Sequence, residues 1–246
     1  MNIDWASTSH MTEIDPTKPL PADIGILEET DLVIIGGSDG VTQTATDNVV
    51  QQVRGSFPDL PLVQEPYASA QISGETTASV DWIVVPVVFN GDRDHFVGNH
   101  VRMLSQLGSD LEALLGQDVS VMDVVEKLVP VGYVIQNTNS KAASIAGVSD
   151  SLSVAQVRGA ALATEIFYDF PIFHVDYAGM FGGTADTTAA ATYFEDTALL
   201  YSGGIDSAQK ATDVLAAGAD AIVVNECFHE NVDAFTQTTR ISPSQI

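Results

Sequence analysis

Residues 199–225, LLYSGGIDSAQKATDVLAAGADAIVVN, decide the fold. A short apolar run, Leu199–Tyr201, leads into a glycine turn and then into Ser207–Ala217, where the spacing of apolar residues is typical of a helix. Gly218 is a suitable residue to end this helix, and a second apolar run, Ala221–Asn225, follows it. Because neither run alternates with polar residues, both are typical of parallel strands that are covered on both faces. The segment therefore predicts a strand–helix–strand unit with parallel strands.

The same unit recurs along the chain. Eight short runs rich in Val, Ile and other apolar residues are predicted strands: Met11–Asp15, Leu32–Ile35, Leu62–Glu65, Trp82–Val88, Gly132–Gln136, Ile172–Asp176, Leu199–Tyr201 and Ala221–Asn225. The predicted helices between and after them are Thr46–Arg54, His95–Leu107, Leu111–Leu115, Val121–Leu128, Val154–Phe167, Thr187–Phe194, Ser207–Ala217 and Glu230–Thr238. Residues 64–80 are rich in Ser, Gly and Thr, so we expect a loop or short turn there in place of a full third helix.

Eight strands alternating with helices predict an α/β fold, a (β/α)₈ TIM-like barrel built on a parallel sheet that closes on itself. An open, doubly wound sheet is the structural alternative. The chain has 246 residues, an ordinary length for one such barrel, and no Pro/Gly-rich linker divides it. We therefore predict a single domain over residues 1–246. With 45% hydrophobic residues and a mean hydropathy of +0.15, the chain can bury a substantial core.

The charge of the chain is strongly acidic. It has 33 Asp and Glu against 9 Lys and Arg, which gives a formal net charge of −24. The acids are spread along the whole sequence, so they do not form a tail. Such a surface repels phosphate backbones, which argues against nucleic acid as a partner. We interpret the charge as a halophilic adaptation, because high salt screens the self-repulsion over a few ångströms.

The sequence also limits the redox, metal and membrane chemistry. A single cysteine, Cys227, excludes an intramolecular disulfide and a cysteine-rich zinc cluster. The five histidines have no zinc-binding spacing. The N-terminal residues include acids and no basic apolar run, and no apolar stretch reaches the roughly 18 residues that span a bilayer. We expect a soluble, cytoplasmic protein.

In a barrel, the carboxyl ends of the strands share one face, and reacting groups gather there. Nearly every predicted strand ends in a carboxylate, an amide, a hydroxyl or a glycine turn: Asp15, Gly36–Gly40, Glu65, Asn90, Asn137, Asp176–Tyr177, Ser202–Gly204 and Asn225–Glu226. Loops of this kind favour polar turn-forming residues in any case. The concentration of such residues nevertheless predicts an active site at this end of the barrel.

Two of the turns have the features of a phosphate site. Tyr201–Ser207 contains Gly203 and Gly204 and leads into a helix. Glycines let backbone N–H groups approach an anion, and a helix N-terminus favours negative charge. Val223–Asn225 ends the eighth strand, and the loops after strands seven and eight are the usual phosphate site of this fold. The glycine run Gly36–Gly40 lacks the spacing of a dinucleotide-binding motif, so NAD is not expected.

Asp15 and Ser38 are candidate ligands of Mg²⁺. This ion takes one or two protein oxygens together with waters and substrate phosphate. The alternative for Asp15 is a cap of the turn before Pro16. Among the histidines, His174 stands apart, because it lies two residues before Asp176 on the same face of a predicted strand.

Taken together, these segments resemble the geranylgeranylglyceryl phosphate synthase family of archaea and its bacterial heptaprenylglyceryl relatives, over nearly the whole chain. The matching segments are His10–Lys18 (family pattern His-x-x-Lys-x-Asp-Pro-x-Lys), Ile35–Thr42, Glu65–Pro66, Val85–Asn90, Gly98–His100, Gly132–Asn137, Phe173–Gly179 (Tyr-x-Glu-Tyr-Ser-Gly), Tyr201–Asp206 (Gly-Gly-Gly-Ile) and Val224–Asn225 (Gly-Asn). Each motif is short, but their order and spacing are specific.

The resemblance implies a prenyltransferase that joins geranylgeranyl diphosphate to sn-glycerol 1-phosphate in archaeal membrane lipid biosynthesis. It implies Mg²⁺ on Asp15 and Ser38, which would hold the diphosphate of the donor, and Asp176 as the base that takes the proton of the attacking hydroxyl. A groove lined by the third to fifth βα units would hold the prenyl chain. The implied substrate-binding residues are Glu13, His174, Val175, Asp176, Tyr177, Ala178, Gly179, Gly203, Gly204, Val224 and Asn225.

Several positions depart from the family pattern. Glu13 replaces a Lys, His174 a Tyr, Asp176 a Glu, Val224 a Gly, and Thr138 a Pro. Glu13 reverses a charge near a phosphate. Asp176 is one methylene shorter than Glu, and Val224 adds a side chain where backbone would approach the anion.

These departures leave two alternatives open: a diverged paralogue that uses another acceptor, and a non-catalytic barrel that binds a phosphorylated ligand. The expected partners are the two small-molecule substrates. A transient contact of the lipid product with a membrane surface and a homodimer are further expectations, the latter from the resemblance.

Overall fold

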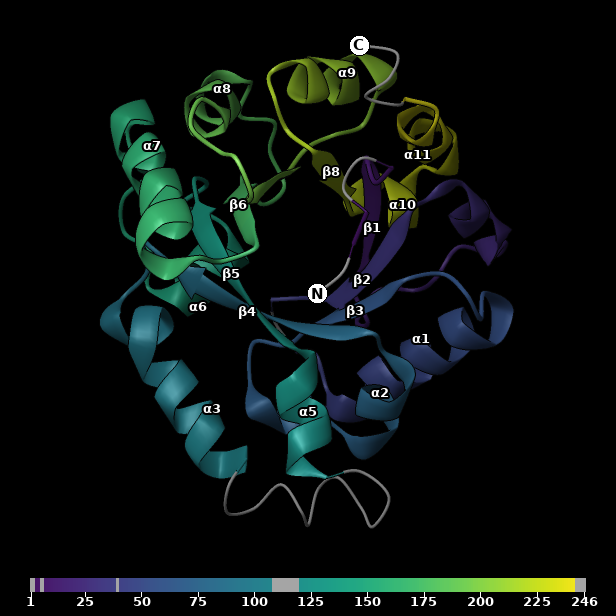
Figure 1. Ribbon diagram of the computed structural model, residues 1–246. Coiled ribbons are helices and arrows are strands. Elements are labelled where there is room, and N and C mark those ends of the chain that lie inside the picture. The colour runs from purple at the N-terminus through teal and green to yellow at the C-terminus, as the bar shows by residue number, and fades with distance from the viewer. Residues whose placement is uncertain (1–2, 5–6, 39, 108–119, 242–246) are drawn as a thin grey trace.

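The computed structural model describes residues 3–4, 7–38, 40–107 and 120–241. Eight parallel strands pair in sequence order and close into a barrel, because β1 pairs with both β2 and β8 (Figure 1). This confirms the predicted barrel and excludes the open sheet. The strands are β1 His10–Ile14, β2 Leu32–Gly36, β3 Leu62–Glu65, β4 Trp82–Val88, β5 Leu128–Ile135, β6 Ile172–Asp176, β7 Ala198–Ser202 and β8 Ala221–Val224.

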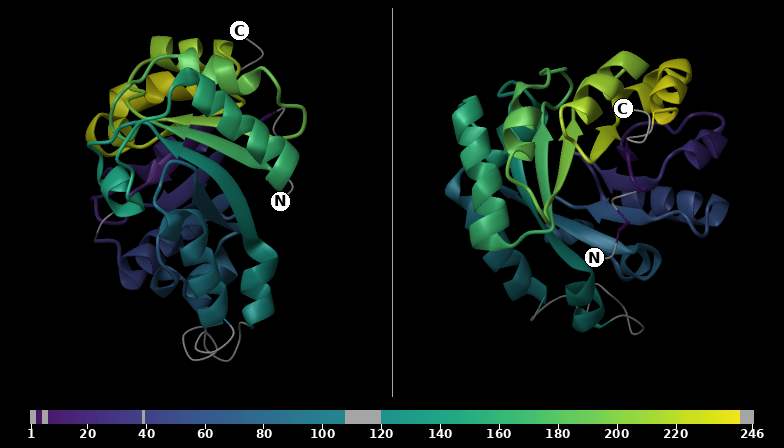
Figure 2. Two further views of the ribbon diagram at one scale, coloured as in Figure 1. Left: turned by 90° about the vertical axis from the view of Figure 1, so that its left-hand side faces the viewer. Right: turned by 45° about the horizontal axis from the view of Figure 1, so that its top comes forward.

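Helices surround the barrel on its outside, as the two further views also show (Figure 2). They are η1 Ile24–Glu29, α1 Gln43–Ser56, η2 Ser69–Gln71, α2 Gly74–Ser79, η3 Asp94–Gly98, α3 Asn99–Leu107, α5 Val121–Lys127, α6 Lys141–Ala146, α7 Val154–Ala163, η4 Thr164–Tyr168, α8 Ala185–Ala191, α9 Ala208–Ala216, α10 Glu226–Glu230 and α11 Val232–Thr239. The predicted helix Leu111–Leu115 lies outside the described residues. Among the described helices, none has the length and apolar composition needed to cross a bilayer.

Two predictions about elements need correction. The third helix is not replaced by a loop: η2 and the six-residue α2 occupy this region, and the Ser73 side chain caps α2 by accepting from the Thr76 N–H at 2.9 Å. A full-length helix is absent, as expected. β5 begins at Leu128, four residues before the predicted Gly132, because pairing with β4 extends back to Ile83. Because of this pairing, Pro130 and the residues on both sides of it belong to β5.

Side chains alternate along each strand between the barrel interior and the layer beneath the helices. The interior cluster includes Met11, Val63 and Tyr133, whereas Phe173 and Val224 pack in the outer layer. This alternation decides which side chain at each strand end can reach the mouth of the barrel.

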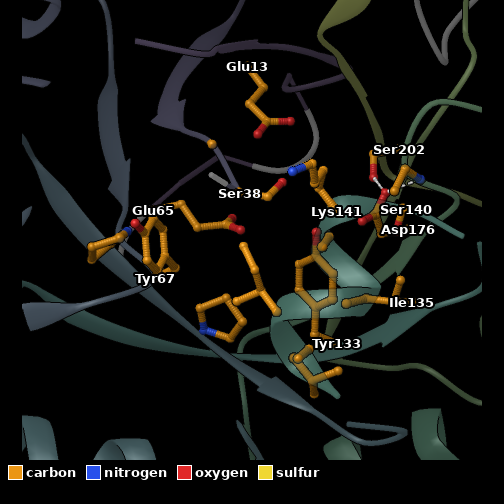
Figure 3. Close-up of a pocket in the computed structure, with 18 of the residues that line it drawn as sticks. Glu13, Ser38, Glu65, Tyr67, Tyr133, Ile135, Ser140, Lys141, Asp176 and Ser202 are labelled. Carbon is orange, nitrogen blue, oxygen red and sulfur yellow. Dashed lines mark hydrogen bonds between the residues drawn. The ribbon is translucent and has the colours of Figure 1, made fainter. Parts of the chain in front are cut away.

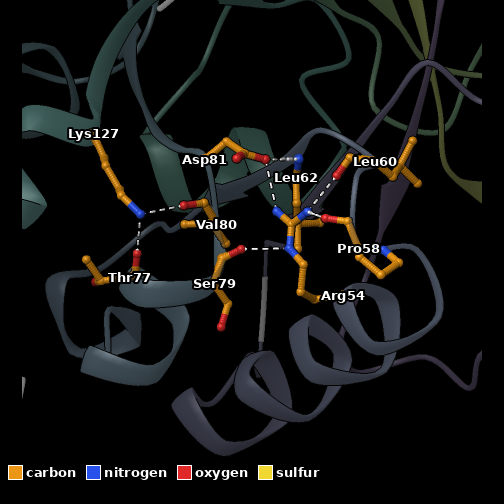
Figure 4. A network of polar contacts seen from close by, with 9 residues as sticks. All are labelled: Arg54, Pro58, Leu60, Leu62, Thr77, Ser79, Val80, Asp81 and Lys127. Carbon is orange, nitrogen blue, oxygen red and sulfur yellow. Dashed lines mark hydrogen bonds and ion pairs between the residues drawn. The ribbon is translucent and has the colours of Figure 1, made fainter.

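Side chains that bind backbone carbonyls hold the region around the short α2 (Figure 4). The Arg54 guanidinium on α1 donates to the carbonyl oxygens of Ser79, Pro58 and Leu60 at 2.8–3.0 Å and to the Asp81 carboxylate at 2.9 Å. One arginine therefore ties α1 to the segments before β3 and β4.

A lysine has the same role on the other side of α2. The Lys127 ammonium donates to the carbonyl oxygens of Thr77 and Val80 at 2.5 and 2.7 Å. The Asp81 carboxylate also accepts from the Leu62 N–H at 2.8 Å, where β3 begins. Arg54 and Lys127 thus hold the short α2 through its backbone carbonyl groups.

We predict that Arg54→Ala lowers the free energy of unfolding by about 2 kcal/mol, because three carbonyl groups lose their donor. Urea denaturation measures the change. Arg158→Ala, which removes the same charge from an exposed position on α7, is the matched control and should change stability by less than about 0.5 kcal/mol. Equal effects of the two substitutions would contradict the proposed role.

Candidate active site

A cavity of about 630 Å³ opens at the carboxyl ends of the strands, and all eight strands or the loops after them contribute to its lining (Figure 3). Most of the substrate and metal ligands predicted from the sequence come together there: Glu13, Asp15, Ser38, Asp176, Ala178, Gly179, Gly203, Gly204 and Asn225. The other four, His174, Val175, Tyr177 and Val224, do not line the cavity.

The side chain of Val224 points away from the cavity. It is 1% exposed and packs in the layer beneath the helices, as Val175 does. Its neighbours on β8, Val223 and Asn225, line the cavity instead. The expectation that Val224 places a side chain in the path of an anion is therefore wrong, because strand alternation turns this residue outward.

Tyr177 supports the cavity wall from behind. Its hydroxyl donates to the buried Asp186 carboxylate at 2.6 Å, and the Gln136 amide donates to the same carboxylate at 2.5 Å. The Asn137 amide donates to the carbonyl of Ala178 at 2.9 Å. The ends of β5 and β6 are thus tied together, which fixes the turn that follows Asp176.

The glycine turn after β7 has the predicted form. Gly203 has φ 109° and Gly204 has φ 61°, a region that favours glycine. A Cβ on Gly203 would lie 2.7 Å from that of Tyr177, and one on Gly204 would meet the backbone of Phe181. The turn can therefore pack this closely against Tyr177 and Phe181 only because both residues are glycines.

Five carboxyl groups line the cavity, those of Glu13, Asp15, Glu65, Asp176 and Glu226, and three of them, Glu13, Glu65 and Asp176, are drawn in Figure 3. Burial, followed by the nearby Glu65 and Asp176, raises the pKa of Glu13 well above its ordinary value. Burial and the charge of Asp176 raise the pKa of Glu65 to about 7. Glu13 therefore favours its neutral, protonated form, so the charge reversal relative to the family's Lys is smaller than the sequence indicates.

Asp176 has opposing influences. Burial raises its pKa, whereas hydrogen bonds from the Ser202 hydroxyl at 2.7 Å and the Ala178 N–H at 2.6 Å act to lower it. Interaction with the Tyr133 hydroxyl also favours the carboxylate. Asp176 is thus the acid of the three with the most donors around it, and the best placed to accept a proton.

The structure confirms one interpretation of Asp15, the turn cap, and the other, a ligand of Mg²⁺, stays a prediction. Its Oδ1 accepts from the N–H and hydroxyl of Thr17 at 2.8 and 2.7 Å, so it caps a turn. It also lines the cavity with Ser38. In the part of the chain that the structure describes, no three His, Cys, Asp or Glu residues form a metal-binding group. An oxygen pair of this kind suits an ion that takes its remaining ligands from water and phosphate.

The apolar part of the cavity lies where the prenyl groove was expected. Its walls come from the third, fourth and fifth βα units: Pro66, Tyr67, Val85, Pro86, Met103, Ile145 and Ala146. The polar and the apolar residues line one continuous cavity. A single ligand with a polar head and an apolar chain can therefore occupy both parts.

Sequence reasoning missed Tyr133 and Lys141. Tyr133 shares the interior face of β5 with Ile135, so strand alternation alone would have pointed to it. Lys141 starts α6, a helix whose short Ala-rich sequence gave no clear signal, and its side chain points into the cavity toward Ser38 (Figure 3).

The fold and the cavity define a TIM barrel with a candidate active site at the carboxyl ends of its strands. The profile of the PcrB family matches residues 3–241, and the chain belongs to this family.

Similar proteins span the whole chain. The geranylgeranylglyceryl phosphate synthase of Methanoculleus marisnigri is 32% identical over 98% of this chain and 99% of its own. The heptaprenylglyceryl phosphate synthase of Lysinibacillus sphaericus is 28% identical over 97% of each. The crystal structure of the Thermoplasma acidophilum (S)-3-O-geranylgeranylglyceryl phosphate synthase with sn-glycerol-1-phosphate has the same fold, with a TM-score of 0.75, 20% identity, and coverage of 95% of this chain and 91% of that one.

We predict that Glu65 makes stability depend on pH. Its pKa rises from 4.5 to about 7 on folding, so the folded state binds the proton more tightly than the unfolded state. The stability from this preference is fully present below pH 4.5 and is lost as pH rises towards 7. Glu65→Gln should therefore become more stable relative to the parent protein across this window. Denaturant unfolding at several pH values tests this, with the exposed Glu75→Gln as the control. A constant difference would contradict it.

Proposed function

We propose that the protein transfers the prenyl group of geranylgeranyl diphosphate to sn-glycerol 1-phosphate, with formation of an ether bond and release of diphosphate, in archaeal membrane lipid synthesis. One observation carries the proposal: a single cavity joins a glycine turn and carboxyl groups to an apolar groove. Similarity over the whole chain to relatives named for this reaction supports it.

The acceptor phosphate lies against the backbone of Gly203 and Gly204, with Asn225 beside it. The acceptor hydroxyl faces Asp176. Its oxygen bonds to the first carbon of the prenyl chain as the bond from that carbon to the diphosphate breaks, and its proton passes to Asp176. The prenyl chain extends past Tyr133 between Met103 and the residues after β3 and β5.

The donor set at the end of β1 and β2 fits Mg²⁺. Asp15 offers a carboxylate that Thr17 holds in place, and Ser38 offers a hydroxyl on the same cavity wall. When bound, the ion supplies positive charge for the diphosphate that leaves. Lys141, whose side chain points toward Ser38, adds a second positive charge on the same side of the cavity (Figure 3).

Glu13 bears on which acceptor is used. As a neutral carboxylic acid it donates one hydrogen bond to a phosphate oxygen, where a Lys would supply a full charge. This weaker contact is what favours an acceptor other than sn-glycerol 1-phosphate as the second candidate.

The deciding assay uses labelled geranylgeranyl diphosphate and several acceptors in molar KCl, a medium chosen because the net charge predicts adaptation to salt. We expect an ether product with sn-glycerol 1-phosphate, loss of product with EDTA, and its return with Mg²⁺. Asp15→Asn should raise the Mg²⁺ concentration for half-maximal rate by about tenfold, since a charged ligand is lost. Product with another acceptor alone would select the second candidate, and no product at all would leave a ligand-binding barrel.

We predict that Glu13→Gln keeps the KM for the acceptor within about threefold, because the amide is also a neutral donor, while Glu13→Ala raises it about tenfold. Steady-state kinetics at fixed donor concentration gives both values. If Glu13→Gln fails as badly as Glu13→Ala, the acid acts through its charge and the assignment is wrong.

Contact with a lipid surface and a homodimer stay predictions from the sequence. The outer face of η3 and α3 exposes Val97, Val101 and Leu104, with spacing that puts them on one side of the helical segment. The opposite face, with Asn99 and Met103, lines the cavity. An apolar outer face beside the groove fits an enzyme whose donor and product are both lipids.

A further inference from the structure

The strand register places three polar side chains next to one another inside the barrel, where hydrogen bonds connect them in series. Asp176 and Ser202 are direct partners in the pairing of β6 with β7, and His174 lies two residues earlier on the same face. The Ser202 hydroxyl donates to Asp176 Oδ1 at 2.7 Å, and His174 Nε2 lies 2.8 Å from Ser202 Oγ. All three side chains are buried.

The direction of these hydrogen bonds is fixed. The Ser202 hydroxyl has one hydrogen, which it gives to Asp176, so its oxygen accepts from His174, whose Nε2 must bear a hydrogen. Burial lowers the pKa of His174 to about 3, so the ring is neutral. The ring of Tyr133, the β5 partner of His174, packs against it with centroids 4.5 Å apart. The donors therefore run from His174 through Ser202 to Asp176.

One oxygen of Asp176 is held twice. Oδ1 accepts from Ser202 and also from the Ala178 N–H at 2.6 Å. Neither of these donors occupies Oδ2, and the Tyr133 hydroxyl is a third partner of the same carboxylate. A carboxylate anchored through one oxygen cannot rotate freely, so the direction in which its other oxygen points is set by the residues behind it.

We propose that His174 and Ser202 are positioning residues that aim the second oxygen of Asp176 at the acceptor hydroxyl. The inference rests on the proposed function, because it assigns Asp176 the proton of that hydroxyl. All three residues differ from the motifs that the chain resembles: Asp for Glu, His for Tyr, and Ser for the first Gly of Gly-Gly-Gly-Ile. Because the three residues contact one another, we infer that the three substitutions compensate for one another. The Ser202 hydroxyl and the His174 imidazole support the shorter side chain of Asp176.

Several other titratable groups face Asp176 and enter any pH profile. They come from β1, β3, β5, β7 and α10: Glu13, Glu65, Tyr133, Tyr201 and Glu226. A test must therefore compare variants that leave all of these groups in place.

Ser202→Ala meets this condition. We expect a fall in kcat of about tenfold with a change in acceptor KM below about threefold, since a hydrogen bond to the reacting carboxylate is lost. The acid limb of kcat/KM should move up by about one pH unit, because the lost donor favoured the charged form. Thr238→Ala is the matched control: it removes a hydroxyl 3.0 Å from the buried His10 Nε2, outside the cavity, and should leave the profile unchanged. An unchanged acid limb in Ser202→Ala overturns the proposal.

A triple-mutant cycle tests compensation. Asp176→Glu alone should lose activity, because the longer acid meets Ser202 and His174. Adding Ser202→Gly and His174→Tyr to it should recover at least about tenfold, a coupling expected only of residues in contact. Additive losses across the three substitutions would refute a compensating set.

A measurement that does not depend on enzymatic activity, the NMR signal of the His174 ring, separates this inference from the proposed function. The ¹⁵N shifts of His174 in the parent protein should report a neutral ring with its hydrogen on Nε2, and Ser202→Ala should change that signal. A hydrogen on Nδ1 in the parent protein would defeat the inference whatever the enzyme makes. No ether product from the parent protein, with the Nε2 signal present, would instead defeat the proposed reaction.

Discussion

The pairing of β1 with β8 closes the sheet, and the arrangement of the site depends on this closure. A closed parallel sheet sends every carboxyl end to one mouth, and strand alternation decides which side chains reach it. Strand alternation turns the side chains of Glu13, Asp176 and Asn225 toward the barrel interior, so they face the cavity. It turns Val224 toward the layer beneath the helices. An open sheet would place the ends of β1 and β8 at its two edges.

The electrostatics of the mouth is unusual for a phosphate site, because carboxyl groups outnumber cations along its wall. Burial eases this conflict. It favours the neutral acid at Glu13 and raises the pKa of Glu65 to about 7, so the cluster holds less negative charge than its composition indicates. Positive charge then comes from Lys18, Arg102 and Lys141, which also line the cavity. Glycine backbone at Gly203 and Gly204 adds donors without adding charge.

The sequence was sufficient for the barrel, because eight apolar runs separated by helices leave few other topologies. It also located Asp15, Ser38 and Gly204, since turn residues at strand ends have distinct signatures. It could not give the extension of β5 through Pro130, because that depends on pairing with β4. The outward direction of Val224 follows from strand alternation once β8 is placed in the barrel. Strand alternation within β5 would have pointed to Tyr133, whereas the short Ala-rich sequence of α6 gave no signal for Lys141.

Pairing between strands also explains why the departures from the family pattern looked damaging one by one. Read along the chain, Asp176 is too short and His174 lacks a partner. Read across β6 and β7, the two residues share Ser202, whose hydroxyl bridges them at 2.7 and 2.8 Å. The shorter Asp176 together with the hydroxyl of Ser202 gives a carboxylate that is held in place. Asp176 without that hydroxyl would leave a gap, and the hydroxyl beside a longer Glu would collide with it. Substitutions in such a site are therefore best compared among residues that contact one another across neighbouring strands. The motif along a single strand contains only some of these residues.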